Sequence, residues 1–435
     1  MVSPSTSVSS AFSCCDHMRR LEEKISIEAL KKLACKHAQS PSAHVQTPAL
    51  QGSYNLVYII TFPDGRKWVA RIPEPSFTDS QKIESMIGTM RLISDKTSLP
   101  LPIVHAYDSF PNNSLGYAYM FTSFIEGIRL SDIWTKPGAL TDANRRHIFQ
   151  QIANSMAQLC VLEFDSIGTL EFPGSDLSYT IGPLRKIEEG KVVHEIGPFP
   201  TALSYINELA SSLADKNNER PSEYAHYSVL CLLSLFLPNP QFDGPPFVLS
   251  PPDFDSQNVM VDPQTFTVTG FLDWDNVFVG PREGGYARYP SWITRGWGPI
   301  MYDWPPRSHT HKEDSNRDQS VTGNAMPKDD EPVHNCSSRE EPPEVLQAHR
   351  DLYYAIYSDI DPTGGEVTRR SHIFEAIVIA LTDPALSAEI MSKLINHVFG
   401  DQWLGMGELL LGIEAGDWLA NTRRGRGAHA SSSES

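Results

Sequence analysis

The sequence lacks long apolar segments and is poor in basic residues. No apolar run reaches the ~18 residues that a membrane-spanning helix needs, so we predict no membrane partner. The stretch MVSPSTSVSSAFSCCDHMRR has no basic segment followed by an apolar core, as a secretory signal would, and we expect a cytoplasmic protein. The net charge of −17 argues against a nucleic-acid partner bound through a broad basic face.

The sequence also lacks paired cysteines. The six cysteines are scattered, and none forms a C-x-x-C pair. Cys14, Cys15 and His17 lie close together, but without the spacing of a zinc site. We therefore predict free thiols in a reducing compartment rather than a disulfide framework.

The distribution of strand and helix patterns predicts an α+β chain with two lobes. A strand-rich lobe precedes a mostly helical one, which is interrupted by a segment almost free of aliphatic residues. Such a segment buries too little apolar surface to offset chain entropy, so we predict disorder there. The predicted boundaries are a partly helical leader 1–45, a strand-rich lobe 46–128, a helical lobe 129–304, a disordered insertion 305–343, C-terminal helices 344–421 and a disordered tail 422–435.

Alternating apolar residues predict the sheet of the first lobe. SYNLVYIITF and RKWVARI flank Pro63-Asp64-Gly65, a hairpin signal, and PIVHAYDSF and GYAYMFTSFIEG indicate two further strands. Between them, Ile83, Ile87, Met90 and Ile93 share one face of a predicted helix. An antiparallel sheet with one inserted helix is therefore expected.

Two carboxylates and an amide form the first group of candidate functional residues. SPPDFDSQNVMVD places Asp253 five residues before Asn258 and a short strand, and GFLDWD places Asp273 at the end of the returning strand. A hairpin between the two strands brings Asn258 and Asp273 to one end. Because Mg²⁺ prefers oxygen ligands, we predict these two as metal ligands and Asp253 as a general base that orients an acceptor hydroxyl.

A second group of candidates lies in the strand-rich lobe. Gly52 and Ser53 in QGSYN would let backbone N–H groups approach phosphate oxygens. Arg71 follows Val-Ala in WVARIP, as the lysine does in the V-A-I-K strand of kinases. A buried arginine needs a partner, and we expect Glu84, on the inward side of the helix that follows, to pair with it.

These motifs carry a resemblance to a known family. D-x-x-x-x-N at Asp253–Asn258, followed by Asp273-Trp274-Asp275, resembles the aminoglycoside phosphotransferase family, which has a protein-kinase-like fold. FDSIGTL, TIGPL and GPFPTALSYI resemble segments frequent in its fungal-type members. The resemblance covers residues from about 50 to 300 and the C-terminal helices.

The resemblance implies a small antiparallel β N-lobe with one helix, a larger and mostly helical C-lobe, and an ATP cleft between them. FTSFIEGIRL resembles the hinge of the family, so backbone groups of Thr122, Ser123 and Phe124 would meet the adenine. The implied cofactors are ATP and Mg²⁺, and the implied partner is a small molecule with a hydroxyl group.

Two positions depart from the family pattern. Pro251 stands where the family has a histidine, and it fixes the backbone and removes an N–H donor. Arg71 replaces a lysine, and a planar, bidentate guanidinium is not its equivalent. Two functions therefore stay open: ATP-dependent phosphoryl transfer to a small-molecule hydroxyl, and nucleotide binding or scaffolding without transfer.

Two further features leave alternatives open. Asp275 would assist a second metal ion or, as we favour, hydrogen-bond the loop. The aromatic residues that follow would pack in the core or line the mouth of an acceptor pocket, where a cationic amine would suit their rings and the acidic surface. They are Trp292, Trp297, Tyr302 and Trp304.

Overall fold

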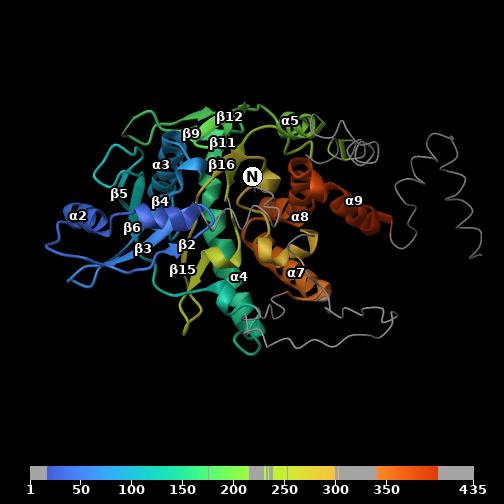
Figure 1. Cartoon of the computed structure of the whole chain (residues 1–435). Helices are drawn as coiled ribbons and strands as arrows, with labels where there is room; N and C mark the ends of the chain where they lie inside the picture. The colour runs from blue at the N-terminus through green and yellow to red at the C-terminus, as the bar shows by residue number, and fades with distance from the viewer. Residues whose placement is uncertain are drawn as a thin grey trace, which may run out of the picture.

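The computed structural model describes residues 17–174, 176–214, 230–231, 234, 239–251, 253–298, 302 and 340–399. The N-terminal strands gather at one end of the molecule and three long helices at the other (Figure 1). This is the two-lobe α+β arrangement that the sequence predicts. Among the described residues, no helix is both long and apolar enough to cross a membrane.

A six-stranded antiparallel sheet forms the N-lobe. Its strands run in the order β1-β3-β4-β6-β5, and β2 pairs with β3. The predicted hairpin is present, with Thr61 opposite Lys67 across its turn. The strands are β1 (His44–Val45), β2 (Leu50–Gln51), β3 (Asn55–Thr61), β4 (Lys67–Pro73), β5 (Val104–Asp108) and β6 (Tyr119–Ser123).

The two faces of this sheet meet different neighbours. Leu56 and Tyr58 of β3 are buried in a separate hydrophobic cluster with helix α2 (Ile27–Ala38), which covers the outer face. Because side chains alternate along a strand, Val57 and its cross-strand partner Arg71 lie on the other face. The alternation therefore turns Arg71 away from α2 and toward the inner side of the lobe.

Helix α3 (Ser80–Lys96) is the predicted inserted helix. The carboxylate of Asp79 caps its N-terminus by accepting the Lys82 N–H at 2.7 Å. Ile83, Ile87 and Ile93 are buried, as their helical spacing predicts. They belong to the same hydrophobic cluster as the C-lobe, so α3 packs as a bridge between the lobes.

The C-lobe combines helices with short sheets. Helix α4 (Asp142–Ala157) begins after Thr141, whose hydroxyl caps it by accepting the Asn144 N–H at 3.2 Å, and α5 (Ala202–Ala214) follows it in the chain. The last described helices are α7 (Pro343–Ile360), α8 (Pro362–Thr382) and α9 (Pro384–Phe399). The short strands are β7 (Ile128–Arg129), β8 (Glu163–Phe164), β9 (Thr169–Glu171), β10 (Thr180–Gly182), β11 (Leu184–Glu188), β12 (Lys191–Ile196), β13 (Phe247–Ser250), β14 (Val259–Val261), β15 (Val268–Phe271) and β16 (Phe278–Gly280).

Short 3₁₀ turns connect these elements. They are η1 (Pro75–Phe77), η2 (Leu130–Asp132), η3 (Gln158–Val161), η4 (Ser256–Asn258), η5 (Arg282–Gly284), η6 (Ser291–Ile293) and η7 (Arg295–Trp297).

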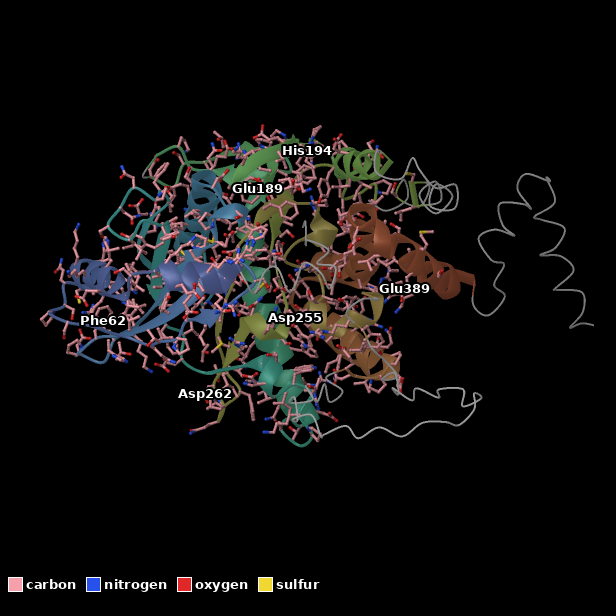
Figure 2. The ribbon with its side chains drawn as sticks, viewed as in Figure 1. Phe62, Glu189, His194, Asp255, Asp262 and Glu389 are labelled. Atoms are coloured by element: carbon pink, nitrogen blue, oxygen red, sulfur yellow. The ribbon has the colours of Figure 1, made fainter. Side chains whose placement is uncertain are left out.

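The β11–β12 hairpin is an element that the sequence analysis did not predict. Its residues are mostly exposed, and its tip crosses to the N-lobe, where the Gly190 N–H donates to the Ser76 carbonyl at 2.9 Å. Figure 2 shows Glu189 and His194 of this hairpin at the upper edge of the molecule, whereas Asp255 lies near its middle. The hairpin therefore links the two lobes away from the centre.

The predicted insertion 305–343 falls mainly outside the described residues, as does the tail 422–435. The prediction of disorder is wrong for its last residues. Glu340 accepts from the Arg295 guanidinium at 2.7 Å, and the Glu341 carboxylate accepts from the indole of a buried tryptophan at 3.0 Å. The composition of a segment carries no information about donors elsewhere in the chain. It therefore predicts disorder even where Arg295 and Trp134 hold the segment in place.

The described cysteines are free thiols, in agreement with the prediction for them. They are Cys35, Cys160 and Cys231. The other three, Cys14, Cys15 and Cys336, lie outside the described residues.

Candidate active site

The loop between β13 and β14 brings Asp253 and Asn258 together. The Asn258 side-chain amide donates to the Asp253 carboxylate at 2.9 Å and to its backbone carbonyl at 3.0 Å. Gln257 donates to the same carboxylate oxygen at 2.9 Å. Because the NH₂ group of Asn258 is bound to Asp253, its amide oxygen is the atom left to face a metal ion.

The predicted β14–β15 hairpin adds Asp273 to this pair. Val259 lies opposite Phe271, and the Leu272 N–H donates to the Asn258 carbonyl at 2.8 Å. One pocket is therefore lined by Asp253, Asn258 and Asp273 together. Asp273 has a φ of +58°, a left-handed conformation that is uncommon for a residue other than glycine.

Arg71 reaches this hairpin from the N-lobe. Its Nη2 atom donates to Asp273 at 3.1 Å and to Asp275 at 3.0 Å, and the Asn55 amide donates to Asp275 at 2.8 Å. The side chain of Arg71 is only 16% exposed. Asp275 therefore hydrogen-bonds to the N-lobe, a structural role that joins the two lobes rather than one confined to its own loop.

The charges at this point favour a cation. Burial and the neighbouring Asp275 raise the pKa of the Asp273 carboxyl above its usual value, and Arg71 offsets part of that shift. Asp253 adds a third negative charge that acts on Asp273, while Arg71 and the nearby Lys82 supply two positive charges, so the group is net negative. A divalent ion bound by oxygen atoms of Asn258 and Asp273 would relieve the repulsion.

The donor set fits Mg²⁺ only in part. Among the described residues, no group of three or more His, Cys, Asp and Glu side chains is arranged to hold a metal ion. Two protein side chains, one of them an amide, would leave most of the coordination to phosphate oxygens and water. Mg²⁺ usually keeps several waters and shares its sites with phosphates, so the residues suit Mg²⁺ delivered with a nucleotide.

The expected pairing of Arg71 with Glu84 is wrong. The Glu84 carboxylate accepts from the Tyr107 hydroxyl at 2.8 Å and from the Ser109 hydroxyl at 2.6 Å. It therefore faces β5 and the turn after it, whereas Arg71 binds the two aspartates. The helical spacing places Glu84 on the inward side of α3, where it is half-buried, but it does not decide which strand the carboxylate meets.

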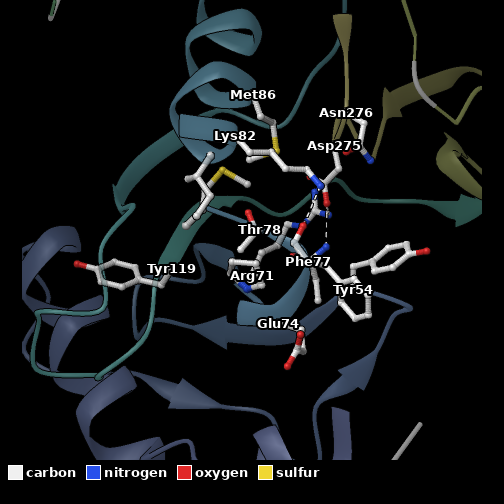
Figure 3. A pocket seen from close by; sticks show the side chains of 14 residues that line it. Tyr54, Arg71, Glu74, Phe77, Thr78, Lys82, Met86, Tyr119, Asp275 and Asn276 are labelled. Carbon is white, nitrogen blue, oxygen red and sulfur yellow. Dashed lines mark hydrogen bonds and ion pairs between the residues drawn. The ribbon is translucent and has the colours of Figure 1, made fainter. Parts of the chain in front are cut away.

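A pocket beside Arg71 contains residues that the sequence analysis missed. Lys82 and Met86, one helical turn apart on α3, line it together with Arg71, Asp275 and Asn55. Figure 3 shows the Lys82 side chain extending from α3 toward Asp275 and Arg71. The spacing of Lys82 and Met86 could have indicated a shared face, but not the direction of that face.

The environment of Lys82 is polar but enclosed. Its ammonium donates to the Phe77 carbonyl at 3.0 Å. Burial lowers the pKa of this ammonium, and the carboxylates of Asp275 and Asp79 oppose the shift. Lys82 is therefore a second cation next to Arg71 at the boundary of the lobes.

The predicted phosphate loop is the tip of the β2–β3 hairpin. Gly52 and Ser53 are exposed there, at the start of the strand that carries Asn55. The Gly52 N–H donates to the Asn55 carbonyl at 3.0 Å. That donor is committed within the turn, so the structure gives it no role toward a phosphate in this conformation.

The predicted hinge residues lie at the end of β6, and two of their backbone N–H groups are already hydrogen-bonded. The Ser123 N–H donates to the Ile103 carbonyl at 2.9 Å, and the Phe124 N–H donates to the Lys67 carbonyl at 3.1 Å. Thr122 is buried within β6. In this conformation the N–H groups of Ser123 and Phe124 are therefore not available to an adenine.

The tryptophans after Asp273 pack in the core. Trp292 and Trp297 are 3% and 6% exposed, and Trp292 contacts the rings of Trp134 and Phe254. The Tyr302 hydroxyl donates to the Glu341 carbonyl at 2.8 Å, and Trp304 lies outside the described residues. The two described tryptophans therefore form core rather than the mouth of a pocket.

Comparison with known proteins identifies the family. A profile of the phosphotransferase enzyme family matches residues 45–284, more than half of the chain. A subtelomeric hrmA-associated cluster protein of Aspergillus fumigatus is 24% identical over 309 residues, 55% of this chain and 59% of the relative. The altered inheritance of mitochondria protein 9 of Scheffersomyces stipitis is 31% identical over 120 residues, 26% of this chain and 19% of that protein. The chain thus spans less than two thirds of the length of these curated relatives.

Solved structures are also similar. A complex of aminoglycoside phosphotransferase APH(4)-Ia with ADP and hygromycin B matches 86% of this chain and 98% of its own, at 14% identity and a TM-score of 0.44. The macrolide 2′-phosphotransferase MphH of Brachybacterium faecium matches 94% and 100%, at 11% identity and a TM-score of 0.40. On the match to the family profile, this protein belongs to the phosphotransferase enzyme family, as its motifs predict, and that membership supports a kinase-like function.

Proposed function

We propose that this protein transfers the terminal phosphoryl group of ATP to a hydroxyl group of a small molecule, with the help of Mg²⁺. The observation that carries the proposal is the pocket in which Asp253, Asn258 and Asp273 converge. Phosphoryl transfer depends mainly on positioning and on neutralising charge. A base, two oxygen ligands and a nearby guanidinium supply both.

Asp253 is the proposed base. Its carboxylate is held by the amides of Gln257 and Asn258, which fix its orientation and leave it to accept the proton of an acceptor hydroxyl. Asn258 and Asp273 would hold Mg²⁺ through oxygen atoms. When bound, the ion would neutralise negative charge that develops on the transferred phosphoryl group.

Arg71 is the proposed phosphate-binding cation. Both of its ion pairs use Nη2, so the other guanidinium nitrogens retain donors for phosphate oxygens. Asp275 would keep the guanidinium in place if the Asp273 carboxylate released Arg71 and held the metal ion instead. Lys82 lies in the adjoining pocket and would add a second positive charge near the phosphates.

The acceptor is proposed to be a small hydroxyl compound, and a cationic one suits the net negative charge of the site and of the chain. An aromatic cage for an amine is not part of this proposal, because Trp292 and Trp297 are buried in the core. The cytoplasmic location expected from the sequence stays a prediction, which imaging of a fluorescent fusion would test.

Nucleotide binding without transfer is the second candidate. Three observations favour it: Pro251 in the catalytic loop, an Arg71 that binds both aspartates, and a Gly52 N–H that is committed to the hairpin. In that case the pocket would bind a nucleotide without catalysing its breakdown, and the protein would act through a partner.

Thermal unfolding with ATP, in the presence and absence of Mg²⁺, tests the proposal. Ligand at about 100 times its dissociation constant stabilises the folded state by about 2.7 kcal/mol, which raises the midpoint by several degrees. We expect this rise to require Mg²⁺ and to vanish in Asp273→Ala. Asp165→Ala, which removes an exposed carboxylate, is the control and should keep it.

The outcomes separate the two candidates. A rise that depends on Mg²⁺ and on Asp273, followed by release of ADP, supports phosphoryl transfer. A rise that does not need Mg²⁺ supports nucleotide binding alone. If the midpoint does not rise with ATP, in the presence or absence of Mg²⁺, both candidate functions are contradicted.

A further inference from the structure

Two prolines precede the proposed base, so few backbone donors can anchor this part of the loop. Pro251 has no N–H group, and no side chain at that position can donate a hydrogen bond. The structure holds Pro251 by its carbonyl instead. The Nη2 atom of Arg288 donates to this carbonyl at 2.8 Å, two residues before Asp253.

The side chain of Arg288 is buried, and its guanidinium forms an ion pair with Glu375. The Arg288 side chain is 2% exposed, and its Nη1 atom donates to the Glu375 carboxylate of α8 at 2.6 Å. The guanidinium carbon also lies 6.0 Å from the centre of the Phe254 ring. A charge-assisted bond of this kind is strong and directional, so Glu375 fixes where the guanidinium points.

Helix α8 holds the neighbours of Arg288 as well. The Thr368 hydroxyl donates to the Ala287 carbonyl at 2.6 Å, and the Ser371 hydroxyl accepts the Tyr289 N–H at 3.0 Å. Thr368, Ser371 and Glu375 are three and four residues apart, so they lie on one face of the helix. One face of α8 therefore holds the segment that carries Arg288.

The same segment meets the loop at other points. The Ser291 N–H donates to the Phe254 carbonyl at 2.8 Å, and the Ser250 hydroxyl donates to the Gly284 carbonyl at 2.7 Å. These contacts lie on both sides of Asp253 in the chain. They hold the loop backbone against residues 284–291, while the side chain of Asp253 stays exposed.

We propose that Arg288, oriented by Glu375, is the positioning residue of the catalytic loop, and that it replaces the missing histidine by binding the Pro251 carbonyl. Its role rests on the proposed function of Asp253 as base. The bond acts on the backbone, so it would set the place of the Asp253 carboxylate relative to Asn258 without touching ATP or acceptor.

Backbone hydrogen exchange of the full-length protein tests the positioning itself. We expect Glu375→Gln and Arg288→Lys to speed exchange of the amides at 254–258 by about tenfold, because a loosened tether lets the loop open more often. Exchange in the N-lobe strands should not change. Glu366→Gln, which breaks an exposed pair with Arg369 on the same helix, is the matched control and should leave the loop unchanged.

Turnover of ATP to ADP, with water as acceptor, gives the second measurement. The two variants should lower kcat by up to about 100-fold, since small displacements of a catalytic group have effects of this size, while KM for ATP stays close to that of the wild type. A role in stability alone would lower Tm without changing kcat of the folded enzyme.

The two measurements separate this inference from the proposed function. Unchanged exchange at 254–258 in both variants overturns the positioning role, whatever the activity. Faster exchange in a protein whose wild type releases no ADP from ATP, with water or with added hydroxyl compounds as acceptor, supports the tether and contradicts phosphoryl transfer. Faster exchange with an unaltered kcat shows that the tether does not serve catalysis, and this also overturns the inference.

Discussion

The candidate site has two sides that differ in how far apart their residues lie in the chain. On the C-lobe side, Asp253, Asn258 and Asp273 fall within one loop and one hairpin, and the structure brings all three into one pocket. On the N-lobe side, Arg71 binds aspartates that are more than two hundred positions away. The first arrangement follows from local geometry, and the second does not.

The difference shows what decides each contact. A short hairpin joins its ends whatever surrounds it, because strand pairing determines which residues face each other. The partner of Arg71 depends instead on how two lobes pack. Glu84 lies on the helix that follows the strand of Arg71, yet its carboxylate accepts from Tyr107 and Ser109, and the C-lobe supplies the carboxylates for Arg71.

The largest expected effect concerns the C-lobe side. Asp253→Asn should reduce turnover of Mg²⁺–ATP by about 10²–10⁴-fold, the usual contribution of general acid–base catalysis, and leave nucleotide binding intact. Coupled ADP release and ATP-dependent thermal shifts measure the two quantities. Asp262→Asn, in the turn of the β14–β15 hairpin that follows Asn258, is a control that should keep the wild-type rate. An Asp253 variant with full activity would refute the proposed base.

A smaller effect is expected for the N-lobe side, and it compares the two possible partners of Arg71. Arg71→Met removes the guanidinium that Asp273 and Asp275 share, and it should destabilise the fold by about 1–3 kcal/mol and weaken ATP binding. Glu84→Gln should cost less than about 1 kcal/mol and leave ATP binding unchanged, because it keeps one acceptor oxygen. Chemical denaturation and ATP titration measure both.

The expected difference between the two variants would be contradicted if Glu84→Gln weakened ATP binding as much as Arg71→Met. That result would mean that Glu84 turns to Arg71 when nucleotide binds. The predicted pairing would then describe the bound state, and the aspartate pairs only the nucleotide-free one.

The smallest expected effect is the pH dependence due to Lys82. Its pKa is lowered by burial in the folded protein from the usual 10.5, so the unfolded chain binds more protons between the two values. Unfolding free energy should therefore rise with pH in that alkaline range, by at most about 1.4 kcal/mol for each pH unit. Lys82→Met should remove this rise, and Lys96→Met, at the exposed end of α3, should keep it. Denaturation at several alkaline pH values provides the measurement.

Sequence patterns predicted much of the fold. The hairpin from Asn55 to Pro73 and the buried face of α3 are both present. Each depends on alternation or helical period within a few residues. The β11–β12 hairpin was missed, because its residues are mostly exposed and lack the apolar alternation of a half-buried strand.

The side chains predicted for the site from one loop and one hairpin lie together in the structure, whereas the predicted backbone donors are already hydrogen-bonded. The N–H groups of Gly52, Ser123 and Phe124 were candidates for phosphate and adenine, but each donates within the N-lobe. Sequence identifies which residues have an N–H group, whereas pairing in a sheet decides whether that group is already bonded.

The two-lobe α+β fold, the family motifs and the convergence of Asp253, Asn258 and Asp273 follow from local patterns and from one hairpin, so they can be predicted from the sequence. The bond from Arg71 to Asp275, the place of Lys82 in the same pocket and the bond from Arg288 to the proline-containing loop depend on tertiary packing. These contacts join segments far apart in the chain. Their geometry is set by the packing of α3 and α8 against the rest of the protein, because buried charges must find partners wherever the folded chain places them.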